Sequence, residues 1–213
     1  RHTIEHMELL FGFVTIGMIG LLGAMSPGPD FAVVTKNSLL HSRKIGVYTA
    51  LGVGVGILVH VAYSLVGIGF IISRSVLLFS VIKFVGAGYL VYLGYQLLRS
   101  KREDLNMGET KRAVDNTLIS PSTAFKNGFF TNALNPKATI FFLSVFTQVI
   151  DPHTALFIQF AYGLEIAVIV GAWFSVLAYF LSTTVVQKRF IRIKHYFERA
   201  TGAILILLGI KVA

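Results

Sequence analysis

Six long apolar stretches, separated by short polar connections, follow one another along the chain. We expect them at about residues 9–40, 45–72, 76–98, 122–150, 154–186 and 193–212. Each reaches or exceeds the roughly 20 apolar residues that a helix needs to cross a bilayer. The pattern therefore predicts an all-α integral membrane protein with six transmembrane helices.

Composition agrees with this pattern. Of the 213 residues 54% are hydrophobic and only 14% are charged, whereas soluble domains carry about 25% charged residues. The net charge of +9 would suit nucleic acid, but the charges lie mainly in the connections between apolar stretches. We therefore expect the lipid bilayer as partner and no nucleic acid.

Several kinds of chemistry are not expected. The chain has no cysteine, which excludes disulfides, thiolate catalysis and cysteine metal sites. Its six histidines are scattered and suggest no metal cluster. We therefore expect no metal, no cofactor and no enzymatic activity.

The polar segment at about 100–120 divides a single membrane domain, residues 1–213, into two halves at about 8–99 and 121–213. Lys83 and Arg199 each stand three residues before a Gly-Ala pair, at Gly86 and Gly202. Three spans per half is an odd number, so the second half must enter the membrane from the opposite side. The sequence thus predicts two inverted three-helix repeats, which are typical of secondary transporters.

Basic residues predict the orientation of the chain. Thirteen of its 19 lysines and arginines lie in or beside the connections that follow stretches one, three and five. Because basic loops stay in the cytoplasm, we expect these three loops inside and both termini in the periplasm. One alternative, a first stretch that enters and returns on the same side, conflicts with the repeat.

Stretches one and four each contain a proline near the middle of the membrane. Ser26-Pro27-Gly28-Pro29-Asp30 interrupts the first, and Asn132-Ala-Leu-Asn135-Pro136-Lys137 interrupts the fourth. Proline lacks an N–H and breaks a helix, and freed backbone groups survive in a membrane only where protein or water lines them. We therefore expect two half-helices in each of these stretches.

The broken helices predict a binding site for a zwitterion. A half-helix N-terminus offers N–H groups and a positive dipole end to a carboxylate, and a C-terminus offers carbonyls to an ammonium. An amino acid carries both groups. The candidate substrate-binding residues are Ser26, Pro27, Gly28, Pro29, Asp30, Asn132, Asn135, Pro136 and Lys137.

Ionisable residues inside apolar stretches suggest proton coupling. Asp30 could bind an ammonium or a proton, and the repeat aligns it with Lys137, with which it could pair in an empty site. Glu165 is a second candidate, with a hydrogen-bonded structural carboxylate as the alternative. His60 is either a packed, hydrogen-bonded histidine or part of a proton relay.

Glycines are expected at close contacts between helices, where a missing side chain lets two backbones approach. The candidates are Gly52, Gly54, Gly56, Gly67, Gly69, Gly86 and Gly88.

The motif residues 25–31, Met-Ser-Pro-Gly-Pro-Asp-Phe, closely resemble the first-helix signature of the lysine exporter / homoserine–threonine resistance (LysE/RhtB) family of bacterial amino-acid exporters. Asn135-Pro136-Lys137-Ala138, the Gly86–Leu90 segment and Ser42-Arg43-Lys44 also resemble family motifs. The resemblance covers essentially the whole chain. It implies proton-driven efflux across the bacterial inner membrane, and Asp30 is similar to the threonine and homoserine branch.

Three alternatives stay open at this level. Relatives with similar motifs differ in substrate, so a basic amino acid or a metal ion could replace the neutral amino acid. A membrane-embedded enzyme would need nucleophile or metal motifs that we do not find. The sequence also leaves open whether the chain forms a homodimer.

Overall fold

The computed structural model describes residues 2–26, 28–99, 119–149, 154–181 and 184–212. These residues are helical apart from short connections, and none of them lies in a strand. The helices are α1 (His2–Met25), α2 (Pro29–Leu40), α3 (Arg43–Arg74), α4 (Val76–Leu98), α6 (Pro121–Ala133), α7 (Pro136–Val149), α8 (Leu156–Leu181) and α9 (Thr184–Val212). The all-α class is confirmed, while Pro27 and residues 100–118 of the polar segment lie outside the described residues.

Within the described part of the chain, three helices are long and apolar enough to cross a membrane. They are the Arg43–Gly67 part of α3, the Ser80–Leu98 part of α4, and α8. The bent pair of α1 and α2 makes a fourth if it crosses as one span. Six spans and the inverted relation of the two halves stay predictions.

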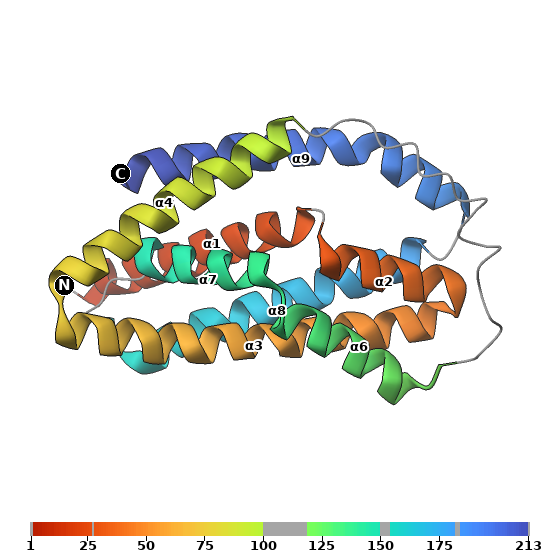
Figure 1. Cartoon of the computed structure of the whole chain (residues 1–213), viewed down its shortest axis with the longest axis horizontal. Helices are drawn as coiled ribbons and strands as arrows, with labels where there is room; N and C mark the ends of the chain where they lie inside the picture. Colours follow the sequence, from red (N-terminus) through yellow and green to blue (C-terminus); the bar gives the residue numbers. More distant parts are fainter. Residues whose placement is uncertain (1, 27, 100–118, 150–153, 182–183, 213) are drawn as a thin grey trace.

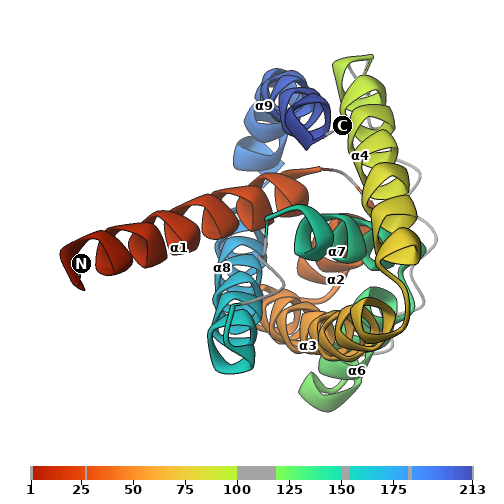
Figure 2. The same ribbon diagram turned by 90° about the vertical axis from the view of Figure 1, so that its left-hand side faces the viewer.

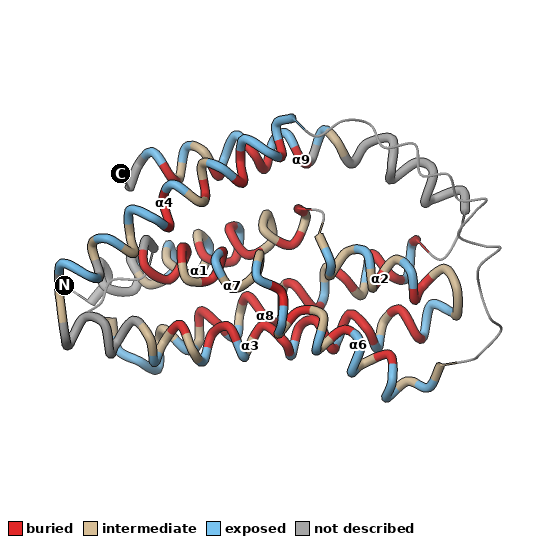
Figure 3. The backbone as a smooth tube through the Cα atoms, in the orientation of Figure 1, coloured by how far each residue is buried: buried red, intermediate tan, exposed pale blue. Residues whose placement is uncertain are grey.

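The outward faces of the helices carry large apolar side chains. Phe11 is 72% exposed, Val66 is 74% exposed and Phe157 is 80% exposed. Buried residues gather instead where the helices face one another (Figure 3). Because so much apolar surface is unfavourable in water, this distribution supports a lipid environment.

Both expected helix breaks occur at the expected prolines. α1 ends at Met25 and α2 begins at Pro29, with a bend of 63° between them. α6 ends at Ala133 and α7 begins at Pro136. Proline suits the first position of a helix because the N–H it lacks would have no partner there. The two breaks lie near the middle of the long axis of the molecule (Figure 1).

The chain termini and the basic start of α3 lie at opposite ends of the molecule. α1 and α9 place the N- and C-terminal ends at the same end of the long axis (Figure 1). The start of α3, with Arg43 and Lys44, and the start of α6 lie at the opposite end. The arrangement agrees with termini that share one side of the membrane. Which side is the cytoplasm stays a prediction.

Glycines allow close crossings of the long helices. A Cβ on Gly52 of α3 would lie 2.0 Å from the Phe125 carbonyl oxygen of α6, and one on Gly128 of α6 would lie 1.9 Å from the Thr49 carbonyl oxygen of α3. Gly94 of α4 and Gly202 of α9 make a similar crossing. The expectation was wrong for Gly67 and Gly88, where an added Cβ would meet no described atom within 4 Å.

The half-helices α2 and α7 lie inside a ring of longer helices. Seen along the long axis, they overlap near the centre, with α1, α8, α3 and α4 around them (Figure 2). α2 packs against α3, α6 and α8, whereas α7 packs mainly against α4 and α3. The two breaks therefore meet in the interior of the protein.

Candidate functional site

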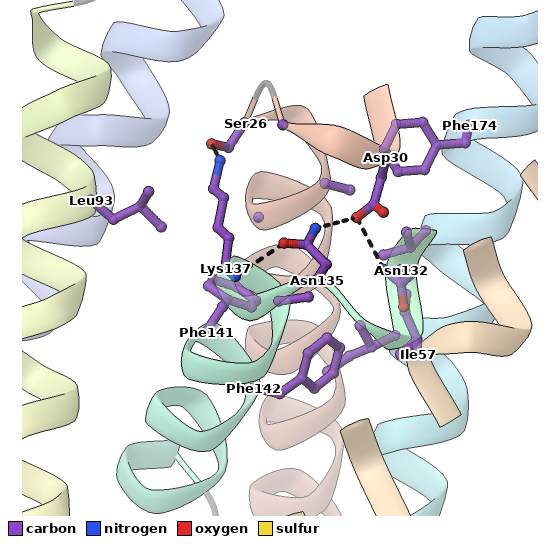
Figure 4. Close-up of a pocket in the computed structure, with 17 residues that line it drawn as sticks. Ser26, Asp30, Ile57, Leu93, Asn132, Asn135, Lys137, Phe141, Phe142 and Phe174 are labelled. Carbon is purple, nitrogen blue, oxygen red and sulfur yellow. Dashed lines mark hydrogen bonds between the residues drawn. The ribbon is translucent and has the colours of Figure 1, made fainter. Parts of the chain in front are cut away.

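A cavity of about 50 Å³ lies where the two breaks meet (Figure 4). One part of its lining is polar and comes from both breaks; the remainder is apolar and comes from α1, α3, α4, α7 and α8. The polar part consists of Ser26, Gly28, Asp30, Asn132, Asn135 and Lys137. The cavity has room for a few water molecules.

Asp30 stands in the first turn of α2, directly after Pro29. Its Oδ2 atom accepts hydrogen bonds from Asn132 Nδ2 at 3.0 Å and Asn135 Nδ2 at 3.2 Å. Its Oδ1 atom is buried and has no hydrogen-bond partner among the described residues. A buried carboxylate oxygen without a donor is unfavourable, so this atom is suited to a cation or a proton.

Lys137 occupies the corresponding position in the second break, directly after Pro136 in α7. Its ammonium donates a hydrogen bond of 2.5 Å to Ser26 Oγ at the end of α1. A positive charge at a helix N-terminus adds to the positive end of the helix dipole, which is unfavourable unless an anion is near. This corner of the cavity therefore attracts negative charge.

Asn135 connects the two breaks. Its Oδ1 accepts a 3.0 Å hydrogen bond from the Lys137 backbone N–H, which caps α7. Its Nδ2 donates to Asp30, and Asn132 does the same from the end of α6. The two amides thus hold the carboxylate of the first half against the second.

The predicted pairing of Asp30 with Lys137 remains a prediction. The structure brings both side chains to the same cavity. The hydrogen bonds described above lead from Lys137 to Ser26 and from the two asparagines to Asp30 (Figure 4).

The prolines and Gly28 have different roles from the polar residues. Pro29 and Pro136 are exposed and do not belong to the described lining, so they shape the half-helices. Gly28 lines the cavity with φ of −171°, a conformation that any residue adopts. A Cβ there would lie 3.6 Å from the Lys137 side chain, which is ordinary contact.

His60 of α3 lies directly behind Asn132 and is fully buried. Its Nε2 is 2.8 Å from the Asn132 carbonyl oxygen, and its Nδ1 is 2.5 Å from the Tyr63 hydroxyl. Its ring stacks on Phe142 of α7, with centroids 5.5 Å apart and planes at 10°. The structure thus brings His60 next to the cavity but not into its lining.

Glu165 of α8 lies away from the cavity lining and against α1. Its Oε1 would be 2.8 Å from a Cβ on Gly17, so the missing side chain makes room for the carboxylate. Its Oε2 is buried without a hydrogen-bond partner among the described residues. The structure does not bring Glu165 together with Asp30.

Sequence reasoning missed the apolar part of the lining and the tyrosine behind it. Apolar residues in apolar helices carry no individual signal, and Tyr63 stands outside every motif. The missed large lining residues are Ile57, Leu93, Phe141, Phe142, Ile166, Val170 and Phe174. No group of three His, Asp or Glu suited to a metal ion occurs in the described part of the chain.

Comparisons with known proteins show the family to which the chain belongs. The family model described as LysE type translocator matches residues 21–213. The chain belongs to this family. The resemblance of the motifs is thereby confirmed, and both breaks of the translocator lie in the matched region.

Named relatives of this translocator are efflux proteins. The threonine efflux protein of Escherichia coli (strain K12) is 30% identical over 202 residues, which cover 95% of this chain and 97% of that protein. The leucine efflux protein of Salmonella choleraesuis (strain SC-B67) is 33% identical over 168 residues, covering 76% of this chain and 75% of that protein. No solved structure matches the chain.

Proposed function

We propose that this translocator exports small neutral amino acids, such as threonine or homoserine, from the cytoplasm across the bacterial inner membrane. The observation that carries the proposal is an interior cavity that presents a carboxylate, an ammonium and an apolar wall together. Family membership and relatives named for threonine and leucine efflux support it. A translocator family also argues against the membrane-embedded enzyme.

The substrate ammonium binds at the carboxylate of Asp30 in this proposal. Asp30 Oδ1 and Asn132 Oδ1 are both buried acceptors without a hydrogen-bond partner among the described residues. An ammonium has three donors and no acceptor, so it can satisfy Asp30 Oδ1. A charge-assisted hydrogen bond of this kind is about twice as strong as a neutral one. Asn132 Oδ1 lies instead against α3, 3.0 Å from a Cβ placed on Gly56.

The substrate carboxylate binds at the opposite corner, beside Lys137 and the start of α7. The ammonium of Lys137 supplies the charge, and the helix N-terminus adds its positive dipole end. The Ser26 hydroxyl, which now accepts from Lys137, can donate its own proton to the carboxylate. An α-amino acid carries its ammonium and its carboxylate on the same carbon atom, so one molecule can offer a charged group to each of the two corners.

The side chain of the substrate faces the apolar wall formed by Phe141, Phe142 and Ile166. Such a wall offers no counter-charge to the side chain of lysine, which disfavours the basic amino acid. It accepts a methyl or methylene group, which both threonine and leucine carry.

Export is coupled to protons in this proposal because Asp30 can hold either an ammonium or a proton. A proton that enters from the periplasm neutralises Asp30 and removes the charge that holds the substrate. Glu165 and His60 are the further candidates for proton transfer.

The test is exchange by the purified protein in lipid vesicles. We expect counterflow of labelled threonine that unlabelled homoserine and leucine inhibit and lysine does not. Asp30→Asn should abolish the exchange, whereas Asp104→Asn, in the polar segment between the halves, should leave it unchanged. Counterflow of lysine but not of threonine would show that the substrate is a basic amino acid and would contradict the neutral one. Absence of exchange with all four amino acids, in a protein shown to be folded, would contradict it and direct attention to metal ions.

A further inference from the structure

The carbonyl oxygen of Asn132 accepts two hydrogen bonds at the end of α6. One comes from the Asn135 backbone N–H at 2.8 Å and the other from His60 Nε2 at 2.8 Å. The side chain of the same residue donates to Asp30. Asn132 therefore joins His60 on α3 to the carboxylate on α2, although His60 and Asp30 belong to different helices.

These contacts determine the tautomer of His60. A carbonyl oxygen can only accept, so Nε2 carries the proton. In the neutral ring Nδ1 is then an acceptor, and its partner at 2.5 Å is the Tyr63 hydroxyl, which must donate. Tyr63 is also hydrogen-bonded to Thr139, at the beginning of α7. When His60 is neutral, the Thr139 hydroxyl thus donates to Tyr63, and the Tyr63 hydroxyl donates to His60 Nδ1.

Protonation of His60 would reverse the direction of these two hydrogen bonds. Both ring nitrogens would be donors, so Tyr63 would accept from Nδ1 and turn its own proton towards Thr139. Thr139 already has an acceptor for its proton, because its Oγ1 lies 3.2 Å from the Asn135 carbonyl oxygen. Every hydrogen bond of the protonated state therefore has a partner in the structure, and its last acceptor is the second asparagine that holds Asp30.

We propose that His60 is a second proton-binding residue beside Asp30, that its charge opposes the substrate ammonium, and that Tyr63 and Thr139 transmit its protonation across the α6–α7 break. This inference rests on the proposed amino-acid site. His60 does not touch the substrate and acts through Asn132. A proton that arrives from the periplasm charges His60 and displaces the substrate ammonium from Asp30. When the proton leaves to the cytoplasm, His60 is neutral again and the next substrate can bind.

The surroundings of His60 contain few other charges. Asp30 on α2 and Lys137 on α7 lie at the same cavity, and Tyr63 is the titratable neighbour on its own helix. α6 contributes the uncharged Asn132, and Glu165 of α8 lies against α1. Among these groups His60 is the one that gains a positive charge next to Asn132.

Binding of labelled threonine to the purified protein, measured from pH 8 to pH 5.5, tests the inference. His60→Gln is the informative variant, because its amide nitrogen can keep the donor to the Asn132 carbonyl but cannot be protonated. At pH 8 we expect the threonine affinities of wild type and His60→Gln to agree within about threefold. Between pH 8 and pH 5.5 the affinity of wild type should fall about tenfold more than that of His60→Gln. His60→Leu should bind weakly at every pH. The same pH profile for wild type and His60→Gln would overturn the inference.

A second measurement does not depend on the substrate. In protein labelled with ¹⁵N-histidine, the resonances of His60 are those lost in His60→Gln. We expect the Nε2–H tautomer at pH 8 and a shift of its Nδ1 resonance in Tyr63→Phe but not in Tyr48→Phe on the same helix. The Nδ1–H tautomer, or no effect of Tyr63→Phe, would contradict the inference even if threonine binds. Absence of threonine binding together with the expected resonances would instead contradict the proposed substrate.

Discussion

Asp30 and Lys137 occupy the same position in two different helices and line the same cavity. Each follows the proline that begins a half-helix, Pro29 in α2 and Pro136 in α7. The helix dipoles are alike at the two positions, but the side-chain charges are opposite. Asp30 complements its helix N-terminus, while Lys137 adds positive charge to its own. The two breaks are therefore alike in their backbone, but the cavity has a negative corner at Asp30 and a positive corner at Lys137.

Lys137→Gln should remove the preference for a substrate carboxylate. A hydrogen bond to a charged group contributes about 1.5–3 kcal/mol, so affinity for threonine should fall by about one to two orders of magnitude. Threonine amide, which lacks the carboxylate, should lose little. Competition of both compounds against labelled threonine measures the difference. Lys126→Gln, on the exposed face of α6, is the control and should behave as wild type. Equal losses for the two compounds would exclude Lys137 as the carboxylate site.

Two substitutions of Asn135 should distinguish its role in capping α7 from its role in holding Asp30 for threonine binding. Asn135→Ser retains an oxygen that can cap α7 but loses the donor to Asp30, so we expect weaker threonine binding with little change in thermal stability. Asn135→Ala loses the cap as well, which destabilises by about 1 kcal/mol. Thermal unfolding in detergent together with threonine affinity distinguishes the two. Asn127→Ala, at an exposed position of α6, provides the control. Full affinity in Asn135→Ser would show that Asn132 alone is sufficient to hold Asp30.

The absence of a side chain at Gly23 should determine how much space the apolar wall leaves for the substrate side chain. A Cβ at this position would lie 2.5 Å from the Phe141 ring, so Gly23→Ala should push the ring into the cavity. We expect exchange of leucine to fall more than exchange of threonine, by about tenfold, since one methylene is worth about 1–3 kcal/mol of discrimination. The ratio of the two counterflow rates measures this. Gly88→Ala, with no described atom within 4 Å of its added Cβ, is the control. An unchanged ratio would place the substrate side chain elsewhere.

The orientation can be measured with single cysteines, because the chain contains none. Ser42 precedes α3 at one end of the molecule, and Ser75 lies between α3 and α4 at the other. We expect a membrane-impermeant thiol reagent to label Ser75→Cys in spheroplasts and Ser42→Cys only after permeabilisation. The reverse pattern would invert the predicted topology while leaving the fold intact.

Most helices and both breaks could be predicted from the sequence because they depend on local chemistry. The sixth stretch was wrong at its start: it was expected from residue 193 after a basic connection, whereas α9 begins at Thr184 and includes that connection. An apolar stretch of about 20 residues in a membrane has to satisfy its backbone groups internally, so it forms a helix. Proline cannot donate to the preceding turn, so α2 and α7 begin where Pro29 and Pro136 stand. The candidate residues Ser26, Asp30, Asn132 and Lys137 were found for the same reason, since polar residues beside a break stand out in an apolar sequence.

The contacts between residues far apart in the chain could be learned only from the tertiary structure. Asp30 and Asn132 are separated by 102 residues, and His60 and the Asn132 carbonyl by 72. Which oxygen of Asp30 is held and which is left without a donor depends on how α2 packs against α6 and α7. The same packing brings Phe141 to the cavity and directs Glu165 towards α1. The sequence therefore determined the helices, their breaks and the charges beside them through local backbone chemistry, while helix packing decided which of those groups meet in one site.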